Sequence, residues 1–194
     1  MVAAIIAASP VLAQSKRDIQ VSKAEAKKAV KTIQKEGFKL LELGDLQIQL
    51  EDFFIEVRSG KRQLVGTGKA YELNLARKEA LQFAMEEYAS TSGSMVKGRI
   101  TTNTARIEEK EINDIVAAYE RLVLNEIKGE VIPRITLKKE QKKEEIEIRV
   151  YCLIDLESAH EARMRAMKNA LDELQLSQKY GSEVSNWIDE GLNK

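Results

Sequence analysis

Apolar residues recur at helical spacing soon after the N-terminus. Ser22-Lys23-Ala24-Glu25 has the form of a capping box, in which serine and glutamate side chains satisfy backbone N–H groups at a helix start. The apolar residues that follow lie three or four apart, at Ala26, Ala29, Val30 and Ile33. This spacing predicts an amphipathic helix from Ser22 to Gly37, and then a short strand within residues 38–43.

The next segment admits two interpretations. Asp45 can cap a helix with one apolar stripe, which comprises Leu46, Leu50, Phe53, Phe54 and Val57. The same stretch begins with the alternation of a strand, through Leu46, Ile48 and Leu50. Because the helical period continues to Val57, we favour the helix. A turn at residues 59–61 and a strand at residues 63–70 follow.

The second half of the chain predicts two further helices and a hairpin. A long helix is expected at residues 73–90, then a less regular stretch through Gly93 and Gly98, then an amphipathic helix over residues 107–123. Apolar residues alternate from Val131 through Pro133 and Ile135 to Leu137, and again over residues 146–154. With a charged loop at residues 138–143, this pattern predicts an antiparallel hairpin.

The last part of the chain predicts a helix and a short tail. Ser158-Ala159-His160-Glu161 resembles a second capping box, and the inward residues of its helix are Met164, Met167, Leu171 and Leu174. In the tail, Val184, Trp187, Ile188 and Leu192 would share one face of a short helix. Together the elements predict an α+β fold, an antiparallel sheet of three to four strands with several helices packed on it.

Small residues predict how the sheet and the long helix meet. Side chains two apart share one face of a strand, and this holds for Gly66, Gly68 and Ala70. Side chains four apart share one stripe of a helix, as do Ala76, Ala80 and Ala84. We assign both sets a structural role, which is to let the helix lie close against the strand.

The N-terminus has the character of a signal peptide. Residues 2–12 carry no charge, and Val11-Leu12-Ala13 places small residues at the −3 and −1 positions of a signal-peptidase site. We therefore expect cleavage after Ala13 and a location that is periplasmic or otherwise exported, with a basic segment upstream of Met1. The expected organisation is a signal peptide at 1–13, a flexible N-terminus at 14–21, one α+β domain at 22–176 and a tail at 177–194.

Charge and candidate chemistry narrow the classes of function. Lys plus Arg and Asp plus Glu both number 31, and the two signs are interleaved along the chain. A neutral chain without a basic block is not drawn to nucleic acid, so we expect no nucleic-acid partner. The mature chain is also expected to have no transmembrane segment, because the apolar start is much shorter than the ~20 residues that span a bilayer.

No motif in the sequence predicts catalysis. Gly66-Thr67-Gly68-Lys69-Ala70 departs from a P-loop, because Gln63 stands at the first glycine position and Ala70 at the Ser/Thr position. Cys152 falls on an apolar strand face and is interpreted as a buried residue rather than a reactive thiol. His160 is the only histidine. A catalytic pair of Cys152 and His160 is possible, but no third residue that would orient the histidine is apparent. We expect no catalytic, cofactor-binding or metal-binding residues, and no cofactor.

Three segments carry a family resemblance. They are Val65-Gly66-Thr67-Gly68-Lys69-Ala70, the helix from Ala76 to Ala84, and Val150-Tyr151-Cys152-Leu153-Ile154. Over residues 63–156 the chain resembles the small membrane-associated lipoproteins first described in Helicobacter and the N-terminal domain of a flagellar assembly protein. It is also similar to secreted proteins of Bacteroides-type bacteria. The resemblance implies an envelope protein of structural or assembly type, although this chain lacks the lipid-bearing cysteine.

The expected function is a non-enzymatic one in the cell envelope. The first hypothesis is a structural, assembly or protein-binding role, with another envelope protein or a second copy as the partner. A binding module for a small envelope ligand, in the groove between sheet and helices, is the alternative, and an enzyme is the third. Trp187 is the only tryptophan, and its two interpretations are a lid on its own domain and an anchor for a partner.

Overall fold

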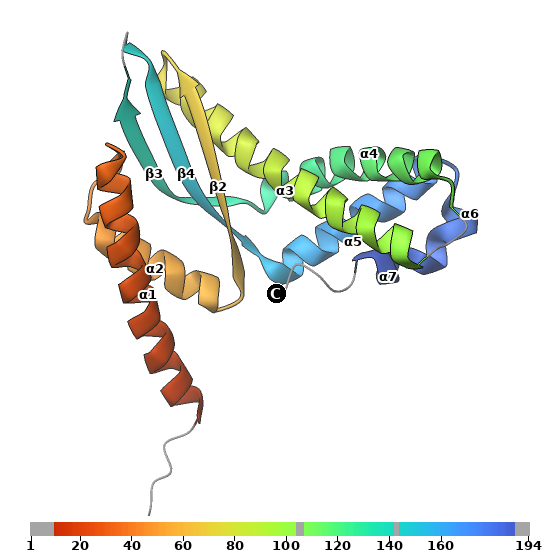
Figure 1. The fold of residues 1–194 in the computed structure, drawn as a ribbon, viewed down its shortest axis with the longest axis horizontal. Coiled ribbons are helices and arrows are strands. Elements are labelled where there is room, and N and C mark those ends of the chain that lie inside the picture. The colour runs from red at the N-terminus through yellow and green to blue at the C-terminus, as the bar shows by residue number, and fades with distance from the viewer. Residues whose placement is uncertain (1–9, 104–106, 142–143, 189–194) are drawn as a thin grey trace, which may run out of the picture.

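The structure, a computed structural model, describes residues 10–103, 107–141 and 144–188. Helices pack against a four-stranded antiparallel sheet (Figure 1), which confirms the predicted α+β class. The strands are β1 (Lys39–Leu40), β2 (Lys61–Ala70), β3 (Ile132–Glu140) and β4 (Ile146–Asp155). The helices are α1 (Pro10–Lys35), α2 (Leu46–Arg58), α3 (Leu73–Asn103), α4 (Glu109–Glu126), α5 (Leu156–Glu173), α6 (Ser177–Tyr180) and α7 (Val184–Ile188), with 3-10 turns η1 (Ile127–Gly129) and η3 (Gly181–Glu183).

The strand order is β1-β3-β4-β2, so β4 lies inside the sheet and β2 forms one edge. The hairpin of β3 and β4 is confirmed, and its pairing reaches Glu140 opposite Ile146. The connecting loop therefore begins after Glu140, not at Lys138 as the sequence predicted. β2 pairs with β4 along its whole length, from Lys61 opposite Asp155 to Ala70 opposite Ile146.

A bulge in β3 overturns one part of the predicted pattern. Pro133 pairs with Cys152 but Ile135 pairs with Tyr151, so Arg134 is an extra residue in the ladder. Because side chains alternate between faces, one extra residue reverses the side on which the later residues lie. The expectation of one unbroken alternation from Val131 to Leu137 is therefore wrong.

The two faces of the sheet support two separate cores. On the first face, the apolar side chains of β4 join a core with α3, α4, α5 and α7; they are Ile148, Val150, Cys152 and Ile154. On the second face, Tyr151 and Leu153 of β4 join Ile135 and Leu137 of β3 under α1 and α2. Figure 1 shows the pair α1 and α2 on one side of the strands and the longer group of helices on the other.

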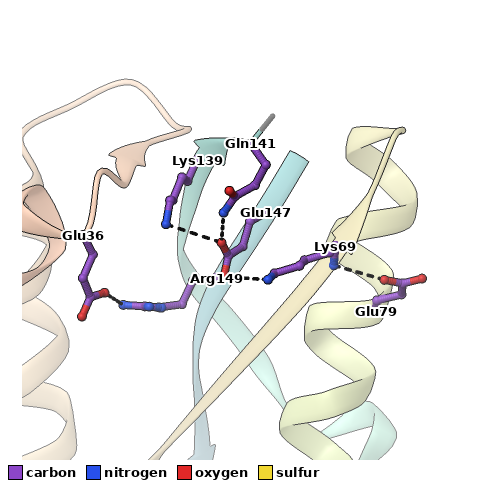
Figure 2. A network of polar contacts seen from close by, with 7 residues as sticks. All are labelled: Glu36, Lys69, Glu79, Lys139, Gln141, Glu147 and Arg149. Atoms are coloured by element: carbon purple, nitrogen blue, oxygen red, sulfur yellow. Dashed lines mark hydrogen bonds and ion pairs between the residues drawn. The ribbon is translucent and has the colours of Figure 1, made fainter. Parts of the chain in front are cut away.

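The second face becomes polar beyond these apolar residues (Figure 2). Glu147 stands between Lys69 and Lys139, its partners on the neighbouring strands, with N–O distances of 4.0 and 3.7 Å. Next to it, Arg149 pairs with Glu36 at 2.6 Å, and its guanidinium carbon lies 4.2 Å from the centre of the Phe38 ring. These contacts tie the segment after α1 to the centre of the sheet.

α1 begins earlier than the sequence predicted. The helix starts at Pro10 and passes through Ser22 without interruption, so Ser22 is a buried helical residue and not a cap. Residues 14–21 are helical as well, where a flexible segment was expected. The reason is local, because this segment holds no glycine or second proline to break a helix, and proline is tolerated in a first turn. Cleavage after Ala13 stays a prediction.

α3 continues well past the predicted end near Ser90. Its buried stripe keeps a spacing of four residues, and comprises Ala76, Ala80, Ala84, Tyr88, Ser92, Val96 and Ile100. Each step of four turns about 40° beyond a full turn of a helix, so the stripe winds around α3. The early residues face the sheet and the later ones reach α4. Gly93 suits its place in this helix because a Cβ there would lie 2.1 Å from the Glu120 carboxylate of α4.

Aspartates cap two of the helices. Asp45 accepts a hydrogen bond from the Ile48 N–H at 3.0 Å, which confirms the predicted α2 and excludes the strand. Asp155 accepts from the N–H groups of Glu157 and Ser158 at 2.9 and 3.1 Å. The expected capping box at Ser158 is therefore wrong, because a carboxylate at the end of β4 already caps α5 one turn earlier.

The backbone of α3 lies directly on β2. A Cβ built on Gly66 would lie 1.8 Å from the Ala80 carbonyl oxygen, and one on Gly68 would lie 2.3 Å from the Ala76 carbonyl oxygen. These distances leave no room for any side chain at either position. Ala76, Ala80 and Ala84 are at most 1% exposed, and Ala70 is also buried. The glycines and alanines thus meet in the close contact that their spacing predicts.

We expect Gly66→Ala to lower the free energy of unfolding by about 1–3 kcal/mol, because the new Cβ must displace the α3 backbone. Gly68→Leu should cost at least as much. Gly98→Ala is the matched control, since Gly98 lies in α3 with no atom within 4 Å of a built Cβ. There alanine should add up to about 1 kcal/mol. Urea denaturation measures all three, and a Gly66→Ala protein as stable as the parent would contradict the close contact.

Candidate functional site: the open edge of β2 and the adjoining arginine cluster

The nucleophile considered from the sequence is buried. Cys152 is inaccessible in the core under α3, and burial raises the pKa of its thiol to about 12, with Arg77 opposing the shift. A thiol with this pKa stays protonated at neutral pH and is a poor nucleophile. His160 is half-buried in the second turn of α5. Among the described side chains, no group of three His, Cys, Asp or Glu could hold a metal ion.

Trp187 lies inside its own domain. Its side chain is 2% exposed, and its ring centre lies 5.7 Å from that of Tyr180. Val184 and Ile188 are buried beside it in the core that α3 and α5 share. This geometry corresponds to the lid and leaves Trp187 inaccessible as an anchor for a partner. Leu192, the last residue of the expected face, lies outside the described residues.

The outer edge of β2 presents backbone groups to solvent. The Lys69 N–H donates to the Glu79 carboxylate of α3 at 3.2 Å (Figure 2), so it points away from β4. Paired and unpaired residues alternate in an antiparallel ladder, so the N–H and C=O groups of Val65 and Thr67 point outward too. Within the described part of the chain, no protein group hydrogen-bonds to those two N–H groups.

An apolar groove adjoins this edge. It encloses about 830 Å³ and is lined by Thr67 and Lys69 of β2 and by Leu81, Phe83 and Met85 of α3. Phe83 is 49% exposed, which is high for a side chain of its size. Lysines 69, 78 and 128 line the groove along with Glu79 and Glu86. An unpaired strand edge beside exposed apolar side chains is the surface to which an extended peptide adds.

Two arginines lie close to the other end of β2. Arg163 of α5 is 6% exposed, and its Nη1 donates to the Tyr88 hydroxyl of α3 at 3.1 Å. The guanidinium carbon of Arg62 lies 5.6 Å from the centre of the Tyr88 ring. Burial lowers the pKa of Arg62, Tyr88 opposes this shift, and the charge of Arg163 adds to it. We call Arg62, Tyr88 and Arg163 the arginine cluster.

A second pair of polar side chains lies deeper in the same core. The hydroxyls of Ser92 and Tyr119 are 2.5 Å apart, joining α3 to α4. Burial raises the pKa of Tyr119, and the hydrogen bond with Ser92 opposes that shift. The tyrosine is therefore neutral at any physiological pH, and the pair has a structural role. It explains how a serine is accommodated in the buried stripe of α3.

The sequence predicted neither the β2 edge nor the arginine cluster as a site. Phe83 was seen only as one residue of a helix, and nothing in the chain order relates Arg62 to Arg163. The sequence held one indication of the edge, which is that residues 61–70 contain basic residues but no acidic one. For the cluster no local pattern existed, since its members come from three elements that only the fold brings together.

Trp187→Ala should lower the free energy of unfolding by about 3–5 kcal/mol, because it removes a large buried ring from the core. Phe83→Ala is the matched control, another aromatic-to-alanine change but at a half-exposed position, and should cost less than about 1 kcal/mol. Thermal unfolding followed by circular dichroism compares the two. Equal, small effects would mean that α7 does not form part of the folded core.

Comparison with known proteins gives no assignment for these sites. No family model matches the chain, and neither a curated protein nor a solved structure matches it. Among the described helices, none is both long and apolar enough to cross a membrane. The open β2 edge and the arginine cluster are therefore interpreted from their own geometry and chemistry.

Proposed function

We propose that this chain is an exported, non-enzymatic protein of the cell envelope that binds an extended segment of a partner protein along β2. The observation that carries the proposal is the unpaired outer edge of β2 beside the apolar groove of α3. Export rests on the signal-peptide character of residues 1–13, and the envelope setting also agrees with the resemblance to small envelope lipoproteins. A binding role agrees with the protonated, inaccessible thiol of Cys152.

Backbone pairing would supply the affinity at this edge. A partner strand can bond to the outward N–H and C=O groups of Val65 and Thr67, and its alternate side chains then face the groove. Phe83 and Leu81 would contact apolar side chains of that strand. Lysines 69, 78 and 128 favour acidic residues in the segment or beside it. The expected partner is thus an extended segment in which apolar and acidic residues alternate.

A second copy of the chain is a poorer occupant of the same edge. Antiparallel pairing of β2 with itself along its full length would place Lys61 opposite Lys69 of the other copy. Like charges directly opposite one another destabilise a sheet. The Glu79 carboxylate also accepts a hydrogen bond from the outward Lys69 N–H, and charged side chains are a common means of protecting a strand edge. A different protein with acidic residues avoids the opposed lysines, and it can pair with Val65 and Thr67, whose N–H groups Glu79 does not bind.

Photo-cross-linking in the native host tests the proposal. With benzoylphenylalanine at position 83, we expect adducts that map to one extended segment of one envelope protein. Position 132 is the control, because Ile132 is as exposed as Phe83, at 52%, but lies on β3. Thr67→Pro should abolish the adducts, since proline removes the outward N–H. Thr67→Val keeps that N–H and should retain them.

Three outcomes would contradict the proposal. One is an adduct pattern at position 83 that does not differ from that at position 132. The second is cross-linking only to another copy of the chain, which would indicate self-assembly. The third is full retention of the adducts in a Thr67→Pro protein. The melting temperature of each variant shows separately whether the fold is intact.

A further inference from the structure

The arginine cluster has hydrogen-bond donors without acceptors. The Nε of Arg163 is buried and has no hydrogen-bond partner among the described residues. The Tyr88 hydroxyl accepts from Arg163, so its own hydrogen remains available to donate. Arg62 makes no hydrogen bond or ion pair with any described side chain. Every unmet group in the cluster is thus a donor.

The charges of the cluster are also uncompensated. Neither guanidinium forms a salt bridge with a carboxylate in the described part of the chain. A buried charge is costly unless it is paired, and two like charges close together add repulsion. The lowered pKa of Arg62 reflects both costs. An anion placed between these donors would pair with the charges and screen their mutual repulsion, and so would reduce both costs.

A cavity of suitable size adjoins the donors. It encloses about 220 Å³ between β2 and α3, and Arg62 and Tyr88 line it together with Gln63, Leu64, Glu87 and Thr91. The Thr91 hydroxyl and the Gln63 amide are further neutral donors. Glu87 is the one carboxylate among these lining residues, and it is exposed, so water screens its charge. Arg163 is not among the lining residues, but it donates to the Tyr88 hydroxyl, and its charge acts on the cavity through that contact.

We propose that this cavity binds a small oxyanion, of the phosphate or carboxylate class. Arg62 would contact the anion directly, the Tyr88 hydroxyl would donate to it, and Arg163 would orient that hydroxyl and contribute its charge. A planar, charged guanidinium suits oxyanions of both shapes. The cavity also borders Val65 of the open edge, but its donors are the side chains of Arg62 and Tyr88 and not the backbone groups of that edge. The proposal therefore does not depend on a protein partner.

Titration with inorganic anions tests the proposal on the intact chain. Phosphate, sulfate and acetate are each added at constant ionic strength, with chloride as the reference anion. We expect the Nε–Hε NMR signal of Arg163 to shift saturably with phosphate or acetate and not with chloride. Arg62→Gln and Tyr88→Phe should each weaken that binding at least tenfold. Arg121→Gln is the matched control, because Arg121 is an exposed arginine that pairs with Glu173, and should leave it unchanged.

Thermal unfolding gives a second, independent readout. Without added oxyanion, Arg62→Gln should not lower the melting temperature, since the arginine is then an uncompensated charge. Phosphate or acetate should raise the melting temperature of the parent and not that of Arg62→Gln. The proposal is overturned if no oxyanion shifts the Arg163 signal saturably or if chloride acts equally. It also fails if Arg62→Gln binds as well as the parent, or lowers the melting temperature by itself.

Discussion

The contact between the backbones of α3 and β2 determines much of what this protein can do. Gly66 and Gly68 bring the helix so close that no side chain fits between the two elements. Because α3 is held there, Glu79 reaches the Lys69 N–H and Phe83 lies beside the outer edge of the strand. The same contact places Tyr88 over Arg62, one turn beyond Ala84. The edge, the groove and the arginine cluster therefore depend on one packing interaction.

The sheet assigns different tasks to its two faces. The first face carries the larger apolar core, with Arg62 at one end of β2, and the helices that build both candidate sites. The second is apolar only under α1 and α2, and then turns to the paired charges around Glu147 and Arg149 (Figure 2). These charges pair with opposite charges, whereas Arg62 and Arg163 contact Tyr88 and form no salt bridge with a described residue. The difference between compensated and uncompensated charge is the reason for locating an anion site in the cluster and not on the polar part of the sheet.

The elements that rest on local patterns were predictable from the sequence. The hairpin, the Asp45 cap and the small residues of β2 and α3 each follow from spacing or capping within a few residues. The continuation of α3 was missed because Thr91, Ser92 and Gly93 resemble a loop, and only α4 supplies the hydroxyl and side chain that they pack against. The bulge at Arg134 and the arginine cluster depend on tertiary pairing, which no local pattern encodes.

The central claim is that β2 is paired on one side only and open on the other. Residue-resolved amide hydrogen exchange by NMR, on dilute protein without a partner, tests this most directly. The N–H groups of Leu64, Gly66 and Gly68 point toward β4 and should exchange slowly. Those of Val65 and Thr67 should exchange at least tenfold faster. The Lys69 N–H should exchange at an intermediate rate, because it is bonded to the Glu79 carboxylate. Uniformly slow exchange along the strand would mean that the outer edge is already paired, and would contradict the account.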